Sequence, residues 1–128
     1  MNVKPTESEL EILQVLWSAD SCTVRDVNEK LSKQKGIEVG YTTTLKLMQI
    51  MLEKGLVERN TTHRTHVYKA LISEDDTRKN IVDKIIDTVF KGSAADLVLQ
   101  ALSNKTASQD ELKLIRDFLN NLHTQEKH

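Results

Sequence analysis

The sequence predicts a mainly α-helical protein with one small β-hairpin, on three observations. The 128 residues include one proline and four glycines, so few irregular stretches are expected. Most apolar residues recur at three- and four-residue spacing, the period of an amphipathic helix. The exception follows Gly55, where β-forming residues flank a polar turn. Hydrophobic residues make up 38% and charged residues 29%, which suffices for a core and excludes disorder as the default.

Two N-terminal helices are predicted from their caps. Thr6 followed by Glu9 forms a capping-box pattern, and leucines with Trp17 on one face extend this helix from about Glu7 to Ser18. Thr23 followed by Asp26 predicts the start of a second helix. The expected buried residues of the second helix are Val24, Val27 and Leu31.

A polar segment and a third helix come next. Residues Ser32 to Gly40 include two glycines and are expected to form a loop. A helix is expected from about Tyr41 to Lys54, with Gly55 where a left-handed residue ends a helix. Two opposite faces are expected on this helix. The packing face comprises Thr44, Leu47, Met48 and Met51, and the polar face comprises Thr42, Lys46, Gln49 and Glu53.

The hairpin is expected from two short segments rich in β-formers, Leu56 to Arg59 and His66 to Leu71, on either side of a polar turn. Three short helices followed by a two-stranded hairpin are typical of a winged helix-turn-helix, in which the third helix is usually offered to DNA. We therefore expect a DNA-binding domain over residues 1–72.

The remainder, residues 73–128, is expected to be a three-helix dimerisation domain. Serines at 73, 93 and 108 each precede an acid by three residues, which predicts helices over about 74–91, 94–103 and 109–123. So short a segment would bury only a marginal core alone, whereas a second copy would cover its apolar faces. The candidate dimerisation residues are Ile81, Ile85, Leu97, Ala101, Leu112, Ile115, Leu119 and Leu122, and Val89 is a further apolar residue at the same spacing.

Charge divides unevenly between these regions. Residues 21–72 carry nine basic and five acidic residues, whereas residues 73–128 carry eight basic and ten acidic ones. The positive half is therefore the expected DNA-binding half, and a dimer would double its phosphate contacts. Gln49 has the chemistry to pair with adenine, and groups at the helix start can donate to phosphate. The candidate DNA-binding residues are Tyr41, Thr42, Thr43, Lys46, Gln49, His63 and Arg64.

The sequence resembles the BlaI/MecI/CopY penicillinase-repressor family of bacterial winged-helix transcriptional regulators. The resemblance runs nearly end to end. It rests on the order and spacing of several segments, none of them decisive alone. These are residues 9–17, Tyr41-Thr-Thr-Thr-Leu, residues 53–59, Arg64-Thr-His-Val-Tyr, Phe90-Lys-Gly-Ser and Ser108-Gln-Asp-Glu-Leu.

The resemblance implies a homodimer that binds a palindromic operator through the third helix and the wing and represses until a signal removes it. In some members an upstream sensor and protease cleave the C-terminal helices, and the corresponding bond here is Gln100-Ala101, where the family has an Asn-Phe pair. The cysteine cluster of copper-sensing members is missing, since Cys22 is the only cysteine. Leu45 and Ile50 replace residues that are often basic in the β-lactam repressors, so the operator is not implied.

Two other functions compete with that of a repressor. An enzyme is disfavoured because no phosphate loop, nucleophile motif or metal-ligand spacing occurs, so no catalytic residue, metal or cofactor is expected. A winged-helix adaptor that binds only protein is the alternative, and the absence of any salt-sensitive DNA binding would distinguish it. A cytoplasmic location is expected, because no signal peptide or membrane span is seen and the single cysteine, Cys22, cannot form an intramolecular disulfide. Cys22 itself is expected to be a small buried residue. The operator, the regulated genes and the inducing signal do not follow from the sequence.

Overall fold

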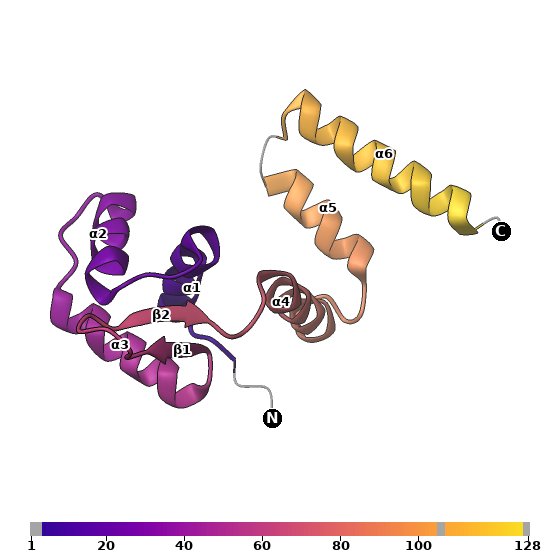
Figure 1. Ribbon diagram of the computed structural model, residues 1–128. Coiled ribbons are helices and arrows are strands. Elements are labelled where there is room, and N and C mark those ends of the chain that lie inside the picture. The colour runs from indigo at the N-terminus through magenta and orange to yellow at the C-terminus, as the bar shows by residue number, and fades with distance from the viewer. Residues whose placement is uncertain (1–3, 105–106, 127–128) are drawn as a thin grey trace. The chain divides into compact units, whose positions relative to one another are not determined.

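The computed structural model describes residues 4–104 and 107–126, which form six helices and one two-stranded antiparallel sheet (Figure 1). The predicted fold class is thereby confirmed. The chain divides into two compact units, Met1–Asn80 and Ile81–His128, with the division inside the fourth helix. The domain boundary expected between residues 72 and 73 stays a prediction. None of the described helices is long and apolar enough to cross a membrane. The elements are α1 (Glu7–Ala19), α2 (Val24–Lys35), α3 (Tyr41–Lys54), β1 (Val57–Asn60), β2 (Val67–Ala70), α4 (Glu74–Thr88), α5 (Ala94–Asn104) and α6 (Gln109–Glu126).

The predicted helix starts are confirmed by their hydrogen bonds. Thr6 and Thr23 both form capping boxes, in which the hydroxyl accepts from the backbone N–H three residues on and the acid there accepts from the cap's own N–H. The hydroxyls of Ser73, Ser93 and Ser108 accept in the same way at the starts of α4, α5 and α6. Each start is therefore fixed by residues close together in the sequence.

Three predicted helix ends are wrong: helix α6 continues to Glu126 rather than ending near residue 123, and the ends of α2 and α4 also differ. Helix α2 continues one turn beyond Ser32, because Gly36 is the residue that adopts the left-handed conformation and lysines occupy the last turn. Helix α4 stops at Thr88 rather than near residue 91, because Lys91 and Gly92 both have positive φ and the Gly92 N–H bonds back to the carbonyl of Ile86. For α2 and α4 the left-handed residue, and not the polarity of the segment, ends the helix.

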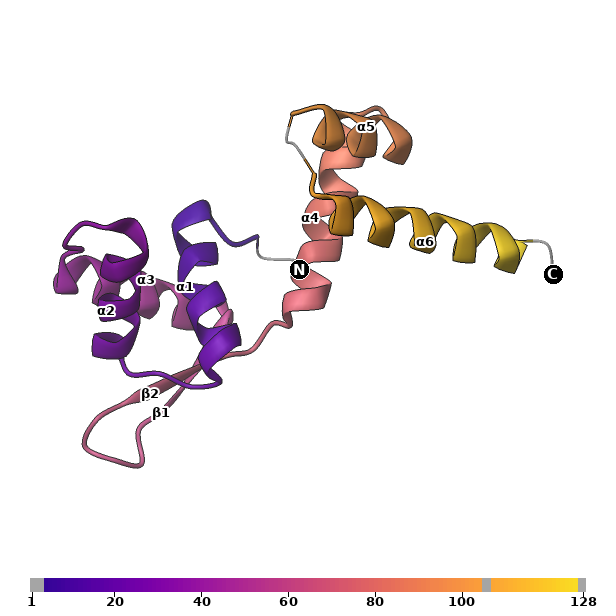
Figure 2. The same cartoon turned by 90° about the horizontal axis from the view of Figure 1, so that it is seen from above.

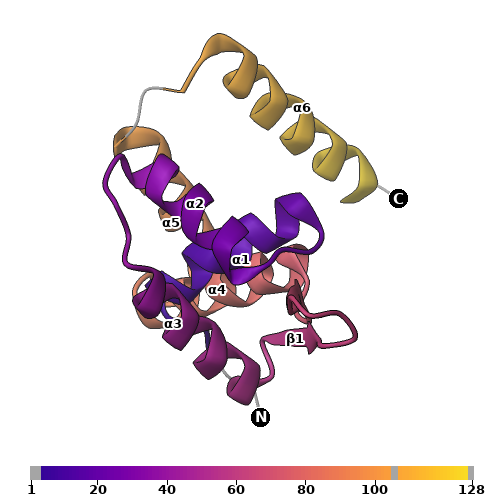
Figure 3. The same ribbon diagram turned by 60° about the vertical axis from the view of Figure 1, so that its left-hand side comes forward.

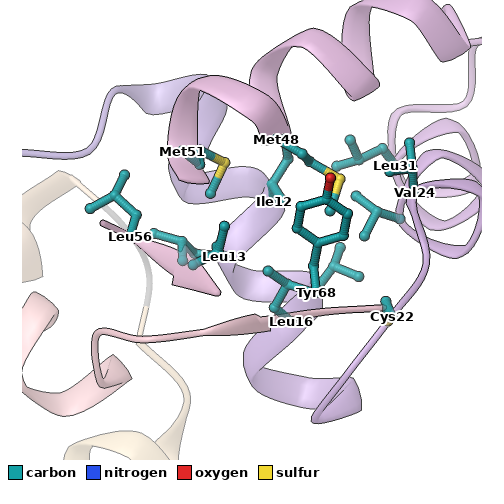
Figure 4. Close-up of a cluster of buried hydrophobic side chains, with 13 residues drawn as sticks. Ile12, Leu13, Leu16, Cys22, Val24, Leu31, Met48, Met51, Leu56 and Tyr68 are labelled. Atoms are coloured by element: carbon teal, nitrogen blue, oxygen red, sulfur yellow. The ribbon is translucent and has the colours of Figure 1, made fainter. Parts of the chain in front are cut away.

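The hydrophobic core lies within the first unit, where α1, α2 and α3 pack together and the hairpin closes one side (Figure 4). Strand β2 contacts α1, and β1 contacts α3. Trp17 flanks this core, and its indole N–H donates to the Ile72 carbonyl at 3.0 Å. The fully buried side chains of the core include Ile12, Leu13, Leu16, Val27, Met48, Met51, Leu56, Val57 and Tyr68.

The hairpin extends away from the three helices, with residues 61–66 at its free end (Figure 2). Its strands pair with Arg59 opposite Tyr68, and each starts later than the sequence predicts, at Val57 and Val67. A third segment joins it, because the N–H and C=O of Cys22 both bond to the backbone of Tyr68, at 3.0 and 2.7 Å. Sequence reasoning missed this bridge, which fixes strand β2 of the hairpin to the α1–α2 connection.

A buried ion pair joins the start of α1 to the end of α3. Glu9 is 1% exposed, and both of its carboxylate oxygens accept from the Lys54 ammonium, at 2.9 and 3.0 Å. Burial raises the pKa of Glu9, but the hydrogen bonds from the Thr6 backbone and Lys54, together with the Lys54 charge, outweigh burial, and the pKa is lowered. Lys54 keeps part of its side chain in water, which limits its own desolvation.

We expect Glu9→Gln to destabilise the protein by about 2 kcal/mol at neutral pH, because it leaves Lys54 without its charged partner. Since the folded-state pKa of Glu9 is depressed, the stabilisation is present above the unfolded-state pKa of about 4.3 and is lost as the pH falls through the folded-state value. Urea unfolding at neutral and acidic pH measures both effects. Glu7→Gln, an exposed acid of the same first turn, is the control; equal losses in the two variants would contradict the prediction.

Candidate DNA-binding surface

The polar face of α3 is exposed along its whole length. Thr42, Lys46, Gln49 and Glu53 are all solvent-exposed, while Thr44, Met48 and Met51 are buried against the core and Leu47 is partly buried. The predicted division of this helix into two faces is therefore confirmed. Leu45 and Ile50 are half-buried, so the most exposed side chains of this face are the polar ones. The roles of Thr42, Lys46 and Gln49 in binding DNA stay predictions.

The start of α3 presents backbone donors without a side-chain cap. Its N-cap is Gly40, which makes no side-chain hydrogen bond, and no acid lies in the first turn. Tyr41, Thr42 and Thr43 follow with exposed side chains. The first N–H groups of a helix carry partial positive charge and lack partners within the helix, so this end suits a phosphate.

Helix α2 fastens the chain that leads into α3, and sequence reasoning missed this role. The Asn28 amide donates to the Val39 carbonyl at 2.9 Å, and the Ser32 hydroxyl accepts from the Val39 N–H at 3.0 Å. The two polar residues stand four apart on α2, a spacing that puts them on one face and was the available signal. Because the sequence analysis places Ser32 in a loop, it does not recognise this shared face on α2.

The wing, which consists of β1, β2 and the connecting residues 61–66, has its polar tip in solvent. Residues His63 and Arg64 are exposed between the strands, and the Asn60 side chain shapes the turn by accepting from the Thr62 N–H at 2.9 Å. Among the described residues, neither Lys46 nor Arg64 forms an ion pair. Both positive charges are therefore available to an anionic partner.

Cys22 and the acidic and histidine side chains do not form a second site in the described ranges. Cys22 is buried, as expected, and burial raises the pKa of its thiol, with a lesser opposing effect of Lys30. Within residues 4–104 and 107–126, no group of three His, Cys, Asp or Glu residues could hold a metal ion. The thiol therefore remains protonated at neutral pH and acts as a small core residue.

The second unit has many apolar side chains that remain exposed to solvent in the single chain. None of the described side chains from residue 81 onward is fully buried. Of the predicted dimerisation residues, Ile81, Leu97, Leu112 and Ile115 are half-buried, whereas Ile85, Ala101, Leu119 and Leu122 are exposed. Val89, an apolar residue at the same spacing, is exposed as well. Sequence reasoning missed several further exposed residues, although their helical spacing was visible. They are Val82, Val98, Leu99, Leu114 and Phe118.

The chain is similar in sequence to known regulatory proteins and repressors. The family model described as penicillinase repressor matches residues 5–121. The methicillin resistance regulatory protein MecI of Staphylococcus aureus strain N315 is 25% identical over 115 residues, which cover 90% of this chain and 92% of MecI. The penicillinase repressor of Bacillus licheniformis is 26% identical over 118 residues, which cover 89% of this chain and 88% of that protein.

Solved structures share the fold. The DNA-binding domain of the repressor BlaI, 27% identical, matches 59% of this chain and 93% of its own length with a TM-score of 0.50. A mutant MarR of E. coli, solved with operator DNA, matches 91% of this chain and 74% of its own with a TM-score of 0.52, but at 18% identity it shows the fold alone. From the match over residues 5–121, the chain belongs to the penicillinase repressor family, whose members are DNA-binding transcriptional regulators and not enzymes.

Proposed function

We propose that this repressor binds a palindromic operator as a homodimer, with α3 in the major groove and the wing on the sugar-phosphate backbone or in the minor groove. The observation that carries the proposal is the exposed polar face of α3 beside its uncapped N-terminus, both in the unit that holds the wing. Lys46 and Gln49 are the proposed base contacts, and Tyr41, Thr42 and Thr43 contact bases or phosphate beside the helix start. Arg64 and His63 approach the DNA from the wing.

The proposed homodimer rests on α6. Its apolar residues form one continuous arc that covers roughly 160° of the helix circumference, and polar residues occupy the rest. Leu114 and Phe118, at one edge of this arc, are 70% and 62% exposed. A contiguous apolar surface of this kind is typical of an interface, and a second copy supplies a matching apolar surface. Two copies then bring two recognition helices to the two halves of a palindrome.

Release from the operator is proposed to need an upstream signal. The resemblance implies a sensor or protease as that partner, but the bond between Gln100 and Ala101 lies inside α5 and is therefore protected until the helix unfolds locally. Ala101 also offers a hydrophobic subsite less apolar surface than Phe would. We therefore propose that cleavage at this bond is not built into the sequence, whereas loss of the C-terminal helices by any route abolishes binding.

Substitutions on α3 and the wing test the proposed DNA contacts. We expect Lys46→Ala or Gln49→Ala to cost about 1–3 kcal/mol on the best operator and to flatten sequence preference. Arg64→Ala should weaken binding to all sequences alike and reduce the slope of log affinity against log salt by about 1. Mobility shifts at two or more salt concentrations, on the operator selected from random duplexes, measure both effects.

Lys33→Ala is the matched control, because it removes the same charge from an exposed position in the last turn of α2. If Lys46→Ala and Gln49→Ala bind as the unmodified chain does, the assignment of the α3 face is wrong. If the unmodified chain shifts no duplex at any salt concentration, the protein-binding adaptor becomes the better function.

A further inference from the structure

The connection between α2 and α3, residues 36–40, runs as an open loop from the end of one helix to the start of the next (Figure 3). Both backbone polar groups of Val39 in this loop are bound by side chains of α2. The Asn28 amide nitrogen is 2.9 Å from the Val39 carbonyl oxygen, and the Ser32 hydroxyl oxygen is 3.0 Å from the Val39 nitrogen. The loop is therefore fixed at the residue just before the N-cap of α3.

Asn28 also holds the first turn of α3 from the other side of the N-cap. Its amide nitrogen donates to the hydroxyl oxygen of Thr44 at 3.0 Å, and that hydroxyl in turn donates to the Gly40 carbonyl at 3.4 Å. Thr44 is fully buried, so its hydroxyl has a fixed position. One side-chain amide thus uses both of its hydrogens, one on the loop and one on the recognition helix.

This bracing replaces the local cap that α3 lacks. The other helices of the chain begin at a Ser or Thr whose hydroxyl binds the helix's own backbone, whereas Gly40 has no side chain to do so. A local cap would occupy the N–H groups at the helix start. Bracing from α2 orders the same turn through the loop carbonyl and a side-chain hydroxyl, and it leaves those N–H groups free.

We propose that Asn28 is a positioning residue for operator recognition, which sets the start of α3 against α2 so that Thr42, Thr43 and Lys46 meet the DNA in register. The proposal rests on the proposed role of α3. Asn28 acts through Val39 and Thr44 rather than by touching a base, so its loss should lower affinity for the operator much more than affinity for unrelated DNA. Nonspecific binding, which comes from charge, does not need the exact position of the helix start.

The test compares affinity for the operator with affinity for an unrelated duplex of equal length. We expect Asn28→Ala to lower the ratio of the two affinities about ten-fold, since two hydrogen bonds are lost. Asn28→Asp has nearly the same shape, but its carboxylate has no hydrogen to donate and faces the Val39 carbonyl oxygen, which can only accept, so an equal or larger fall is expected. Gln34→Ala, which removes an exposed side-chain amide from the same helix, should leave the ratio unchanged.

Two substitutions of Thr44 separate positioning from packing. Thr44→Val keeps the volume and removes the hydroxyl, whereas Thr44→Ser keeps the hydroxyl and removes a buried methyl group. If the hydroxyl positions α3, Thr44→Val lowers the ratio about five-fold while Thr44→Ser stays within about two-fold of the unmodified chain. Thermal unfolding, followed by circular dichroism, establishes that each variant is folded at the temperature of the binding assay.

The proposal would be overturned if the affinity ratio fell more in Thr44→Ser than in Thr44→Val, because the ratio would then depend on the lost methyl group and not on the lost hydroxyl. So would folded Asn28→Ala protein with an unchanged affinity ratio. If Asn28→Asp does not fold, Asn28→Ala and the two Thr44 variants still decide the matter. The failure of the proposed function itself looks different: in that case Lys46→Ala leaves operator binding unchanged.

Discussion

Leu119→Asp is expected to convert the protein from a dimer to a monomer and to weaken operator binding by at least about 100-fold. Leu119 lies within the apolar arc of α6 and is exposed in the single chain, so in the proposed dimer it is covered by the second copy. A carboxylate there would have to be buried without a partner or prevent association. The monomer then has half of the phosphate contacts and no linked half-site.

Light scattering at tens of micromolar should give a mass of about twice 14.6 kDa for the unmodified chain and about 14.6 kDa for the variant. Asn120→Asp is the matched control, because it introduces the same charge on the polar side of α6. The variant should retain the folded first unit, whose core contains no residue of α6. A Leu119→Asp dimer that binds the operator normally would show that this face is not the interface.

Tyr68→Ala is expected to remove about 3–5 kcal/mol from the free energy of unfolding, a large part of the stability of a domain of this size. Tyr68 is 2% exposed, and its ring lies among side chains of α1 and α3, including Ile12, Leu16 and Met48 (Figure 4). Its backbone also carries the bridge to Cys22. Loss of the ring would therefore open a cavity where the hairpin meets the three helices.

Tyr68→Phe provides the comparison, because it keeps the ring and removes only the hydroxyl. The change takes away one neutral polar group and opens no large cavity, so it should cost no more than about 1 kcal/mol. Urea unfolding followed by circular dichroism measures both variants, and the wing's contribution to DNA binding should fall with the first one only. Equal stability of Tyr68→Ala and Tyr68→Phe would mean that the ring does not fasten the wing.

The features that were predictable from the sequence are those set by neighbouring residues. The starts of five helices follow from a Ser or Thr and an acid three residues later, and the two faces of α3 follow from its period. The bridge between Cys22 and Tyr68 joins residues far apart in the sequence, which no local pattern reports. For the bracing by Asn28, the four-residue spacing of Asn28 and Ser32 indicates a shared polar face on α2, but it does not identify Val39 as the partner. The polar residue Ser32 indicated the start of a loop, but it lies inside α2, where its hydroxyl binds the Val39 N–H. The predicted end of α2 is therefore too early.

Trp17 gives this protein a natural fluorescent reporter at a useful place. It is the only tryptophan, so the emission comes from one indole. Its N–H donates to the Ile72 carbonyl, immediately before the serine that caps α4, and its ring is partly exposed at the edge of the core. Emission from an indole depends on the polarity and hydrogen bonding of its surroundings, so the wavelength of Trp17 reports on the segment through which the wing continues into α4. A titration with operator DNA can thus be followed at this joint without attaching a dye.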